Sequence, residues 1–389
     1  MPRMPIRALE FFSGIGGLHY GLERADPTAT VLASFDMNQN ANACYHANFG
    51  FKPSTTSIDT LSLQAVERFG ANCWLLSPPC QPFTQGGKRL DHEDKRSLAL
   101  LHLIDLLGQI SAPPDFVFLE NVPNFEVSVC RSRLVECLDA RNYDIREFLV
   151  SPVQIGVAND RRRYYLCARR RSADAPKSDT PYLQAPRVIT TMLSDPVKTF
   201  SQPGSDSDGR DTEPAWKPTP PQISSYLQPL EDVSPHLVPQ EYILKRKSFR
   251  FDLVKPTDRI SSCFTKAYGS HHVIGSGSFL QTERLDVRVL AFNIVLRRSP
   301  LTGVAAQVEF AVDDGPSVVA ARPRFFRPTE VARLHGFPID GPPRGDPRLH
   351  AMAFPDSLSV AQQLKLLGNS LSVDVVAHLL SGLLAANAD

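Results

Sequence analysis

One cysteine of this chain stands where its thiol could act as a nucleophile. Cys80 lies in the segment SPPCQPFT at 77–84, directly after an apolar run. The three prolines stiffen the segment and keep it out of regular secondary structure, so the thiol should lie at the end of a strand, within reach of a ligand. Lone cysteines are usually inert and buried, and we expect Cys44, Cys73 and Cys167 to be of that kind. Cys80 is the predicted reactive thiol.

A carboxyl group follows another apolar run. Glu120 ends the run FVFLE and precedes Asn121-Val122-Pro123. In a doubly wound sheet the carboxyl ends of neighbouring strands lie along one rim, so Glu120 and Cys80 should face the same crevice. A carboxyl group in a partly dry crevice can have a raised pKa and donate a hydrogen bond or a proton. A single glutamate before a loop is more often a surface acid, and the combination with Cys80 favours a catalytic role.

A glycine-rich turn near the N-terminus could hold a nucleoside-containing cofactor. The segment FFSGIGGL at 11–18 is typical of a strand that turns through glycines into a helix, whose N–H groups can approach a ligand. Asp36 ends the next apolar run, where an acid can accept hydrogen bonds from ribose hydroxyls. The spacing lacks the third glycine of the dinucleotide pattern. This argues against a pyrophosphate ligand and a nicotinamide oxidoreductase.

The elements that must position these residues alternate between two periodicities. Short apolar runs, separated by helix-period stretches such as 97–110 and 132–140, occur between Ile6 and about Ala168: ALEFF, VLASF, CWLLS, FVFLE and YYLCA. This alternation predicts a parallel sheet with crossover helices, the doubly wound α/β class. Near the C-terminus, 329–334 and 372–385 are predicted helices.

The middle of the chain has a different composition. From about Arg171 to Gln240 it is rich in Pro, Ser and Asp, which disfavours sheet or helix. We predict a mobile loop at about 199–222 and a second irregular segment at 300–322.

Composition limits the class of protein. With 389 residues and 42% hydrophobic content, one or two domains are expected. No run reaches the roughly 18 apolar residues of a membrane helix, and no signal peptide is recognisable, so we expect neither a membrane partner nor secretion. The seven cysteines lack CxxC pairs, which predicts reduced thiols, no metal site and a cytoplasmic or nuclear location. The net charge of +1 leaves nucleic-acid binding to local basic clusters, at 161–163, 169–171, 245–247 and 297–298.

Six motifs, in order, resemble the motif series of the C5-cytosine methyltransferases. They are FSGIGG, SPPCQPFT, ENV, the basic NDRRR at 159–163, the RFF, TE and GFP residues at 324–338, and GNS at 368–370. The resemblance covers about 1–170 and 322–385. It implies a Rossmann-like, S-adenosylmethionine-dependent methyltransferase domain built from 1–170 and 322–389, with the last helix packed beside the first strand. A smaller target-recognition lobe would occupy 171–321.

The resemblance also implies a chemical scheme. The Cys80 thiolate would add to C6 of cytosine, so that C5 can attack the cofactor's methyl group and leave S-adenosylhomocysteine. Glu120 would hydrogen-bond the ring N3 and amino group, Arg161 and Arg163 would hold the ring carbonyl or phosphates, and Pro79 would shape the pocket wall. The implied cofactor-binding residues are Phe12, Ile15, Gly16 and Gly17 around the methionine and adenosine, Asp36 on the ribose, Ser57, Ile58 and Asp59 near the adenine, and Ser77, Asn369 and Ser370 closing the site.

The substrate prediction depends on one further motif. CFTKAYG at 263–269 resembles the signature of the branch that methylates cytosine 38 in the anticodon loop of aspartate tRNA, where the base is already unpaired. Lys266 and Tyr268 are predicted substrate contacts, although packing is an equally good interpretation for Tyr268. For Cys263, packing is favoured over a second functional thiol. DNA cytosine-5 methylation remains an alternative, as does a noncatalytic RNA-binding protein on the same scaffold.

Overall fold

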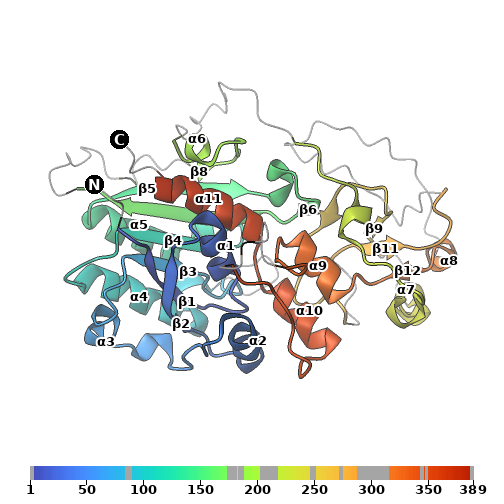
Figure 1. Ribbon diagram of the computed structural model, residues 1–389, viewed down its shortest axis with the longest axis horizontal. Coiled ribbons are helices and arrows are strands. Elements are labelled where there is room, and N and C mark those ends of the chain that lie inside the picture. Colours follow the sequence, from blue (N-terminus) through green and yellow to red (C-terminus); the bar gives the residue numbers. More distant parts are fainter. Residues whose placement is uncertain are drawn as a thin grey trace.

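A mixed β-sheet forms the centre of the larger part of the molecule. The computed structural model describes residues 4–83, 90–172, 182, 188–201, 218–245, 251–270, 275–286, 315–341, 346 and 349–385. Within them the strand order is β2-β1-β3-β4-β7-β5-β8 (Figure 1). The bounds are β1 Arg7–Phe11, β2 Thr30–Phe35, β3 Cys73–Leu76, β4 Phe116–Asn121, β5 Tyr143–Val150, β7 Arg163–Arg170 and β8 Val188–Ile189. All five apolar runs are strands, which confirms the α/β prediction.

The sheet is not parallel throughout, and this corrects the sequence-based expectation. Strands β2, β1, β3 and β4 are mutually parallel, but β7 runs antiparallel between β4 and β5. Strand β5 was not predicted, because its sequence YDIREFLV is interrupted by charged residues. One of these, Glu147, is fully buried and accepts hydrogen bonds from Arg131 of α5 (Nε to Oε1, 2.8 Å) and from Tyr164. A paired charge of this kind is tolerated in a core.

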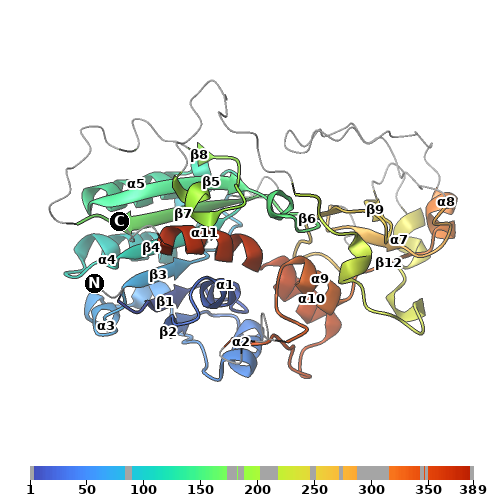
Figure 2. The same ribbon diagram turned by 45° about the horizontal axis from the view of Figure 1, so that its top comes forward.

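Helices cover both faces of the sheet. On one face, apolar side chains of α4 (Leu98–Gln109) and α5 (Val129–Ala140) pack against Leu9, Phe11 and Leu119. On the other, α1 (Gly17–Ala25) and α11 (Val373–Ala385) pack against Ala8 and Phe118. The predicted helices 97–110, 132–140 and 372–385 are therefore confirmed. In both views α11, in red, lies across the blue α1 (Figure 2), so the last helix returns to the N-terminal part of the chain.

The C-terminal helices satisfy a length and composition criterion for membrane spans. The stretch Val360–Ala385 is long and apolar enough to cross a membrane, and 67% of its most apolar window is buried inside the protein. It consists of two helices, α10 (Val360–Gly368) and α11. This burial is what core helices of a folded domain show.

A second group of elements lies to the right in Figure 1. A small sheet, ordered β12-β11-β9, is built from Pro323–Arg324, Phe279–Gln281 and Leu253–Val254. Helices α7 (Gln240–Leu244) and α8 (Gly315–Ala320) accompany it, and α9 (Pro328–Leu334) packs on α10. The remaining elements are α2 (Gln39–Phe49), α3 (Leu63–Glu67) and the pair β6 (Asn159–Asp160) and β10 (Ser261–Ser262).

Three elements pack across the predicted lobe boundaries. β8 pairs with β5, and α6 (Pro196–Ser201) packs on α11, so both lie with the large sheet although they follow residue 171. β12 follows residue 322 yet pairs with β11 of the small sheet. The predicted loop at 199–222 begins inside α6, and 202–217 lie outside the described residues. The segment predicted irregular at 300–322 contains α8, and 300–314 lie outside the described residues.

Candidate active site

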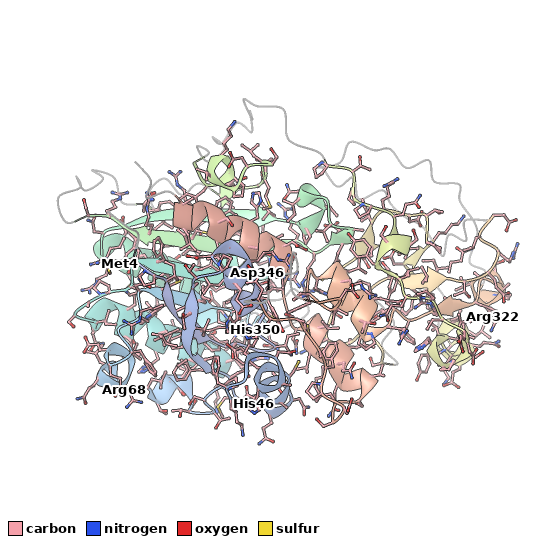
Figure 3. All side chains as sticks on the ribbon, in the orientation of Figure 1. Met4, His46, Arg68, Arg322, Asp346 and His350 are labelled. Atoms are coloured by element: carbon pink, nitrogen blue, oxygen red, sulfur yellow. The ribbon has the colours of Figure 1, made fainter. Side chains whose placement is uncertain are left out.

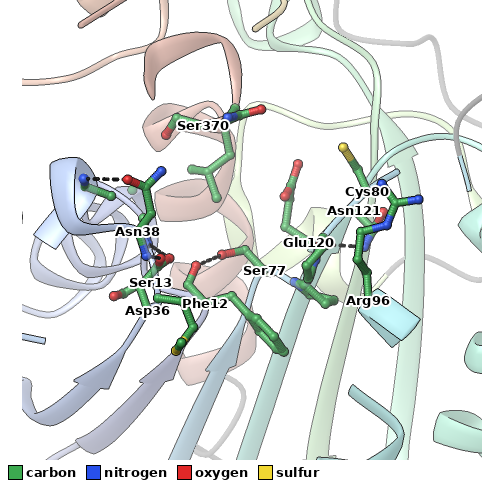
Figure 4. A pocket seen from close by; sticks show the side chains of 18 of the residues that line it. Phe12, Ser13, Asp36, Asn38, Ser77, Cys80, Arg96, Glu120, Asn121 and Ser370 are labelled. Carbon is green, nitrogen blue, oxygen red and sulfur yellow. Dashed lines mark hydrogen bonds between the residues drawn. The ribbon is translucent and has the colours of Figure 1, made fainter. Parts of the chain in front are cut away.

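The carboxyl ends of four parallel strands form the rim that carries the site. Phe11 of β1 is in register with Phe35 of β2 and with Leu76 of β3, and Leu76 pairs with Leu119 of β4. The chain runs from β1 to β2 on one side of β1 and then to β3 on its other side. The strand order therefore reverses between β1 and β3, which is where doubly wound sheets bind ligands. A pocket of about 450 Å³ lies at this rim. Cys80 and Glu120 both line it and point the same way (Figure 4), as predicted from the strand ends.

Hydrogen bonds fix the loop that carries the thiol. The Asn121 side chain donates to the Pro78 carbonyl (3.1 Å), and the Phe83 amide donates to the Cys80 carbonyl (3.0 Å). Burial raises the pKa of the Cys80 thiol and the Glu120 carboxylate adds to the rise, whereas Arg163, Lys266 and Arg161 act to lower it. The thiol is therefore protonated in the free pocket at neutral pH, and it must lose its proton before it can attack.

Glu120 and Arg163 form the polar wall opposite the loop. Nε of Arg163 lies 3.5 Å from Oε1 of Glu120, and both side chains are largely buried. Burial raises the pKa of Glu120 above its ordinary value, even though Arg163 and Arg161 oppose the rise. A carboxyl group whose pKa is raised holds its proton more readily and can share it with a ring nitrogen.

Arg161 is buried and connects the loop at 263–264 to the loop at 368–370 through hydrogen bonds. Its guanidinium donates to Sγ of Cys263 (3.1 Å) and the carbonyl of Phe264 (2.7 Å), and on its other arm to the carbonyls of Gly368 (3.3 Å) and Ser370. It borders the pocket, but these acceptors occupy both terminal nitrogens. The geometry therefore favours a positioning role over the direct contact with the substrate that the resemblance implied.

Cys263 lies between the two arginines. Nη1 of Arg161 is 3.1 Å and Nη2 of Arg163 is 3.5 Å from its Sγ. Burial would raise its pKa, but the two guanidinium groups outweigh burial and hold the pKa below the ordinary thiol value. Cys263 therefore lies in direct contact with two charged groups. All seven cysteines are free.

The other half of the pocket has the chemistry of a nucleoside site. The amide of Gly14 donates to Oδ2 of Asp36 (2.8 Å) and that of Asn38 to Oδ1 (2.7 Å), so the carboxylate is held at the rim. Ser77 donates to the Phe12 carbonyl (2.9 Å), which joins the β1 and β3 loops (Figure 4). Phe12 and Gly14 have positive φ angles of 60° and 54°, so the backbone turns sharply into α1.

Most of the predicted residues lie at this pocket. The predicted residues that line it are Phe12, Ile15, Gly17, Asp36, Ser57, Ile58, Asp59, Ser77, Pro79, Cys80, Glu120, Arg161, Arg163, Asn369 and Ser370. Gly16 does not line it. At φ 83°, a Cβ on Gly16 would stand 2.3 Å from the Phe49 ring, so this glycine is required for close packing under the loop.

Tyr268 and Lys266, the two residues predicted to contact the substrate from the lobe, both lie outside the lining of the pocket. Tyr268 is buried, its hydroxyl donates to the Ser278 carbonyl (2.8 Å) and accepts from the Phe326 amide (2.8 Å), and it does not line the pocket. Of the two interpretations of Tyr268, the structure therefore favours packing over contact with the substrate. Lys266 does not line the pocket either, but its charge acts on Cys80.

Sequence reasoning missed several lining residues. Arg96 lines the pocket near Cys80 and forms a bidentate pair with Asp94 (2.8 and 2.6 Å) (Figure 4). The only signal for this ion pair in the sequence is the short spacing between the two residues. Asn38 caps α2, with its side chain accepting from the amides of Asn40 and Ala41. The other missed lining residues include Met37, Thr56, Lys95, Asn121, Val122, Leu366 and Leu371.

Comparison with known proteins identifies the family. The model of the C-5 cytosine-specific DNA methylases matches residues 6–384. A tRNA (cytosine(38)-C(5))-methyltransferase of Homo sapiens is 32% identical over 97% of this chain and 98% of its own length. A DNA (cytosine-5)-methyltransferase of Dictyostelium discoideum is also 32% identical, over 98% of this chain and 95% of that protein.

Solved structures have the same fold. The Dnmt2 methyltransferase of S. pombe superposes with a TM-score of 0.71 at 28% identity, covering 99% of this chain and all of that one. A methyltransferase of Entamoeba histolytica gives a TM-score of 0.74 at 26% identity over both full chains.

The family found by these comparisons agrees with the residues that line the pocket. The sheet presents a thiol, a carboxyl group and a glycine turn on the rim where doubly wound folds bind ligands, and the solved relatives identify the class as a Rossmann-like α/β methyltransferase. The chain belongs to the C-5 cytosine-specific DNA methylase family, and it is accordingly a cytosine-5 methyltransferase.

Proposed function

We propose that the protein transfers a methyl group from S-adenosylmethionine to C5 of cytosine 38 in the anticodon loop of aspartate tRNA. The observation that carries the cytosine-5 chemistry is the convergence of Cys80, Glu120 and Arg163 in one pocket. The RNA substrate is supported by relatives of nearly full length that bear the name tRNA (cytosine(38)-C(5))-methyltransferase. With seven free thiols, we propose a reducing compartment, the cytoplasm or the nucleus.

The residues of the cofactor half fit this cofactor. Asp36 retains free lone pairs for ribose hydroxyls, since a carboxylate offers about four acceptor positions, and Ile58 and Leu371 supply apolar walls. Asn369 and Ser370 would close the site, with Ser57 and Asp59 near the base. When bound, S-adenosylmethionine supplies an electrophilic methyl group.

The side chains of the other half act on the cytosine. The Cys80 sulfur forms a bond to C6 and breaks the C5–C6 double bond, which makes C5 nucleophilic. Glu120 shares its proton with N3 and so stabilises the charge that this addition creates, with Arg163 fixing the orientation of its carboxyl group. After methylation, loss of the C5 proton expels the Cys80 thiolate and restores the double bond.

A charge from the lobe assists the thiol. Lys266, together with the two arginines, opposes the effects that raise the pKa of Cys80. The CFTKAYG loop that carries Lys266 is fixed against the GNS loop, because a Cβ on Gly368 would stand only 2.2 Å from the backbone of Thr265. We therefore propose that Lys266 contacts the substrate backbone close to the nucleophile.

Glu120→Gln should lower the rate of methyl transfer by about 100-fold, since the acid that shares a proton with N3 is lost. Because the Glu120 charge raises the pKa of Cys80, the acidic limb of the pH–rate profile should also move to lower pH. Single-turnover rates across pH, with cofactor affinity as the control, measure both effects. An unchanged rate would remove Glu120 from the mechanism.

The substrate is tested with labelled S-adenosylmethionine on three nucleic acids at matched salt, because salt dominates nonspecific affinity. These are unmodified aspartate tRNA, its variant with uracil at position 38, and duplex DNA. Labelling of the first alone supports the proposal. Preferential labelling of DNA would favour the activity named for the Dictyostelium relative, and cofactor binding without any transfer would indicate a noncatalytic binding protein.

A further inference from the structure

A surface at the mouth of the pocket is not used by the mechanism above. It consists of residues 90–98, which follow the loop of Cys80, and residues 127–129, at the start of α5. We call it the rim surface. Its residues Lys95 and Arg96 line the pocket, and Arg96 lies on the same side of the pocket as Cys80 (Figure 4). The rim surface therefore borders the half of the pocket assigned to the cytosine.

Three contacts hold the two parts of the rim surface together. The Asp91 carboxylate accepts the first two amides of α5, at 2.6 and 3.3 Å, where a negative charge is favourable. The Ser97 hydroxyl donates to the Asp91 carbonyl (2.6 Å). Beneath them the ring of Phe83, from the loop of the nucleophile, packs edge-on against Phe125 (centroids 4.8 Å apart). The rim surface is thus fixed relative to the nucleophile.

The rim surface exposes four large apolar side chains. Val127 is 81% exposed, Leu98 50%, Leu90 42% and Val129 39%. Leu90 and Leu98 belong to one part of the surface and the two valines to the other, and the hydrogen bonds of Asp91 bring the two parts together. Single exposed apolar side chains are common, but a group of them beside a pocket marks a binding surface.

The charges of the rim surface leave one cation unpaired. Both oxygens of Asp94 accept from the guanidinium of Arg96, and the Asp91 carboxylate is bound by the amides of α5. Glu93 does not line the pocket. Lys95 is exposed, lines the pocket and has no acidic partner among the described residues. A free ammonium group in this place favours an anionic ligand.

We propose that the rim surface binds the RNA strand next to the target cytosine, with Lys95 on a flanking phosphate and Val127 and Leu98 against a neighbouring nucleotide. When the base contacts Cys80 and Glu120, its ribose and phosphates must lie at the mouth of the pocket, where the rim surface begins. A nucleic acid strand alternates phosphates with apolar base faces, which matches a cation set among apolar side chains. A small anion would need the charge alone.

The inference rests on the proposed RNA substrate, and its first test removes the charge. Binding of unmodified aspartate tRNA to Lys95→Met is measured across salt concentrations with S-adenosylhomocysteine present. Loss of one phosphate contact should reduce the slope of log affinity against log salt by about 0.7 and weaken binding about threefold. An unchanged slope would overturn the proposal. So would a loss of S-adenosylhomocysteine affinity of the same size, since it would place Lys95 on the cofactor.

The apolar part is tested by Val127→Ser, which should weaken binding about threefold with the salt slope unchanged. Val197→Ser and Lys198→Met on α6 are the matched controls, and Arg68→Met removes a further exposed cation at the end of α3, at the lower left in Figure 3. All these side chains are exposed, so melting temperatures should match wild type. The controls should bind the RNA as wild type does, and losses equal to those of the rim variants would overturn the proposal.

A modified RNA locates the phosphate. An anticodon stem-loop is made with a neutral methylphosphonate linkage on one side or the other of cytosine 38. One of these linkages should weaken wild-type binding by the same factor as Lys95→Met and should cause no further loss in that variant. Additive losses for both linkages would contradict the contact. Failure of wild type to bind or methylate the tRNA would refute the proposed substrate and this surface together, whereas variants that behave as wild type refute the surface alone.

Discussion

Cys80→Ala is expected to abolish methyl transfer, with a loss of more than about 1,000-fold, because Cys80 is the only thiol among the described residues that line the pocket. Cofactor affinity should stay close to wild type, since Cys80 lies in the half of the pocket assigned to the cytosine. The measurement is single-turnover transfer to aspartate tRNA together with calorimetry of cofactor binding. Transfer that survives the substitution would remove Cys80 as the nucleophile.

The matched control is Cys137→Ala. Cys137 is a half-buried thiol on α5 whose Sγ lies 3.5 Å from the Ile104 carbonyl, away from the pocket. A covalent assay completes the test: RNA with 5-fluorocytosine at position 38 has no C5 proton to lose, so the adduct should accumulate. Wild type and Cys137→Ala should give this adduct, and Cys80→Ala should not.

Arg161→Lys should destabilise the protein and weaken cofactor binding together. The arginine holds the loop at Cys263 and Phe264 to the loop at Gly368 and Ser370 through four acceptors, and an ammonium group cannot reach acceptors on both sides. Buried carbonyls left without donors should lower the free energy of unfolding by about 3 kcal/mol. Denaturant unfolding and calorimetry measure the two effects.

The neighbouring arginine provides the control. Arg162 is exposed, so Arg162→Lys should stay within about 0.5 kcal/mol of wild type. If Arg161→Lys instead keeps both stability and cofactor affinity and lowers only the rate of transfer, Arg161 contacts the substrate, as the resemblance implied.

The sequence predicted the site better than the framework around it. Asp36 and Cys80 follow strands and Glu120 lies at the end of one, and the ends of adjacent parallel strands meet by geometry alone. Strand direction has no such local signal: β7 has the apolar composition of the parallel strands, yet it pairs antiparallel with both β4 and β5. β5 itself was hidden by Glu147, whose partner Arg131 is distant in sequence.

Roles that depend on distant partners were also beyond the sequence. Arg161 belongs to a motif, but its hydrogen bonds to carbonyls near residue 368 depend on how the loop at 263–264 and the loop at 368–370 lie in the fold. The sequence alone does not show that arrangement. Tyr268 carries the same aromatic ring whether it stacks on a base or fills a core, and only its two buried hydrogen bonds decide between these roles.

The position of α11 has a consequence for synthesis of the protein. Its apolar residues, among them Val375, Val376 and Leu379, cover the sheet face and the α1 residues Leu18 and Leu22. A ribosome makes β1 and α1 long before α11, so the nascent chain displays this apolar surface until residue 385 has emerged. Closure of this face of the sheet must therefore wait for α11, and during that interval the unfinished chain is exposed to aggregation and is a natural client for chaperones.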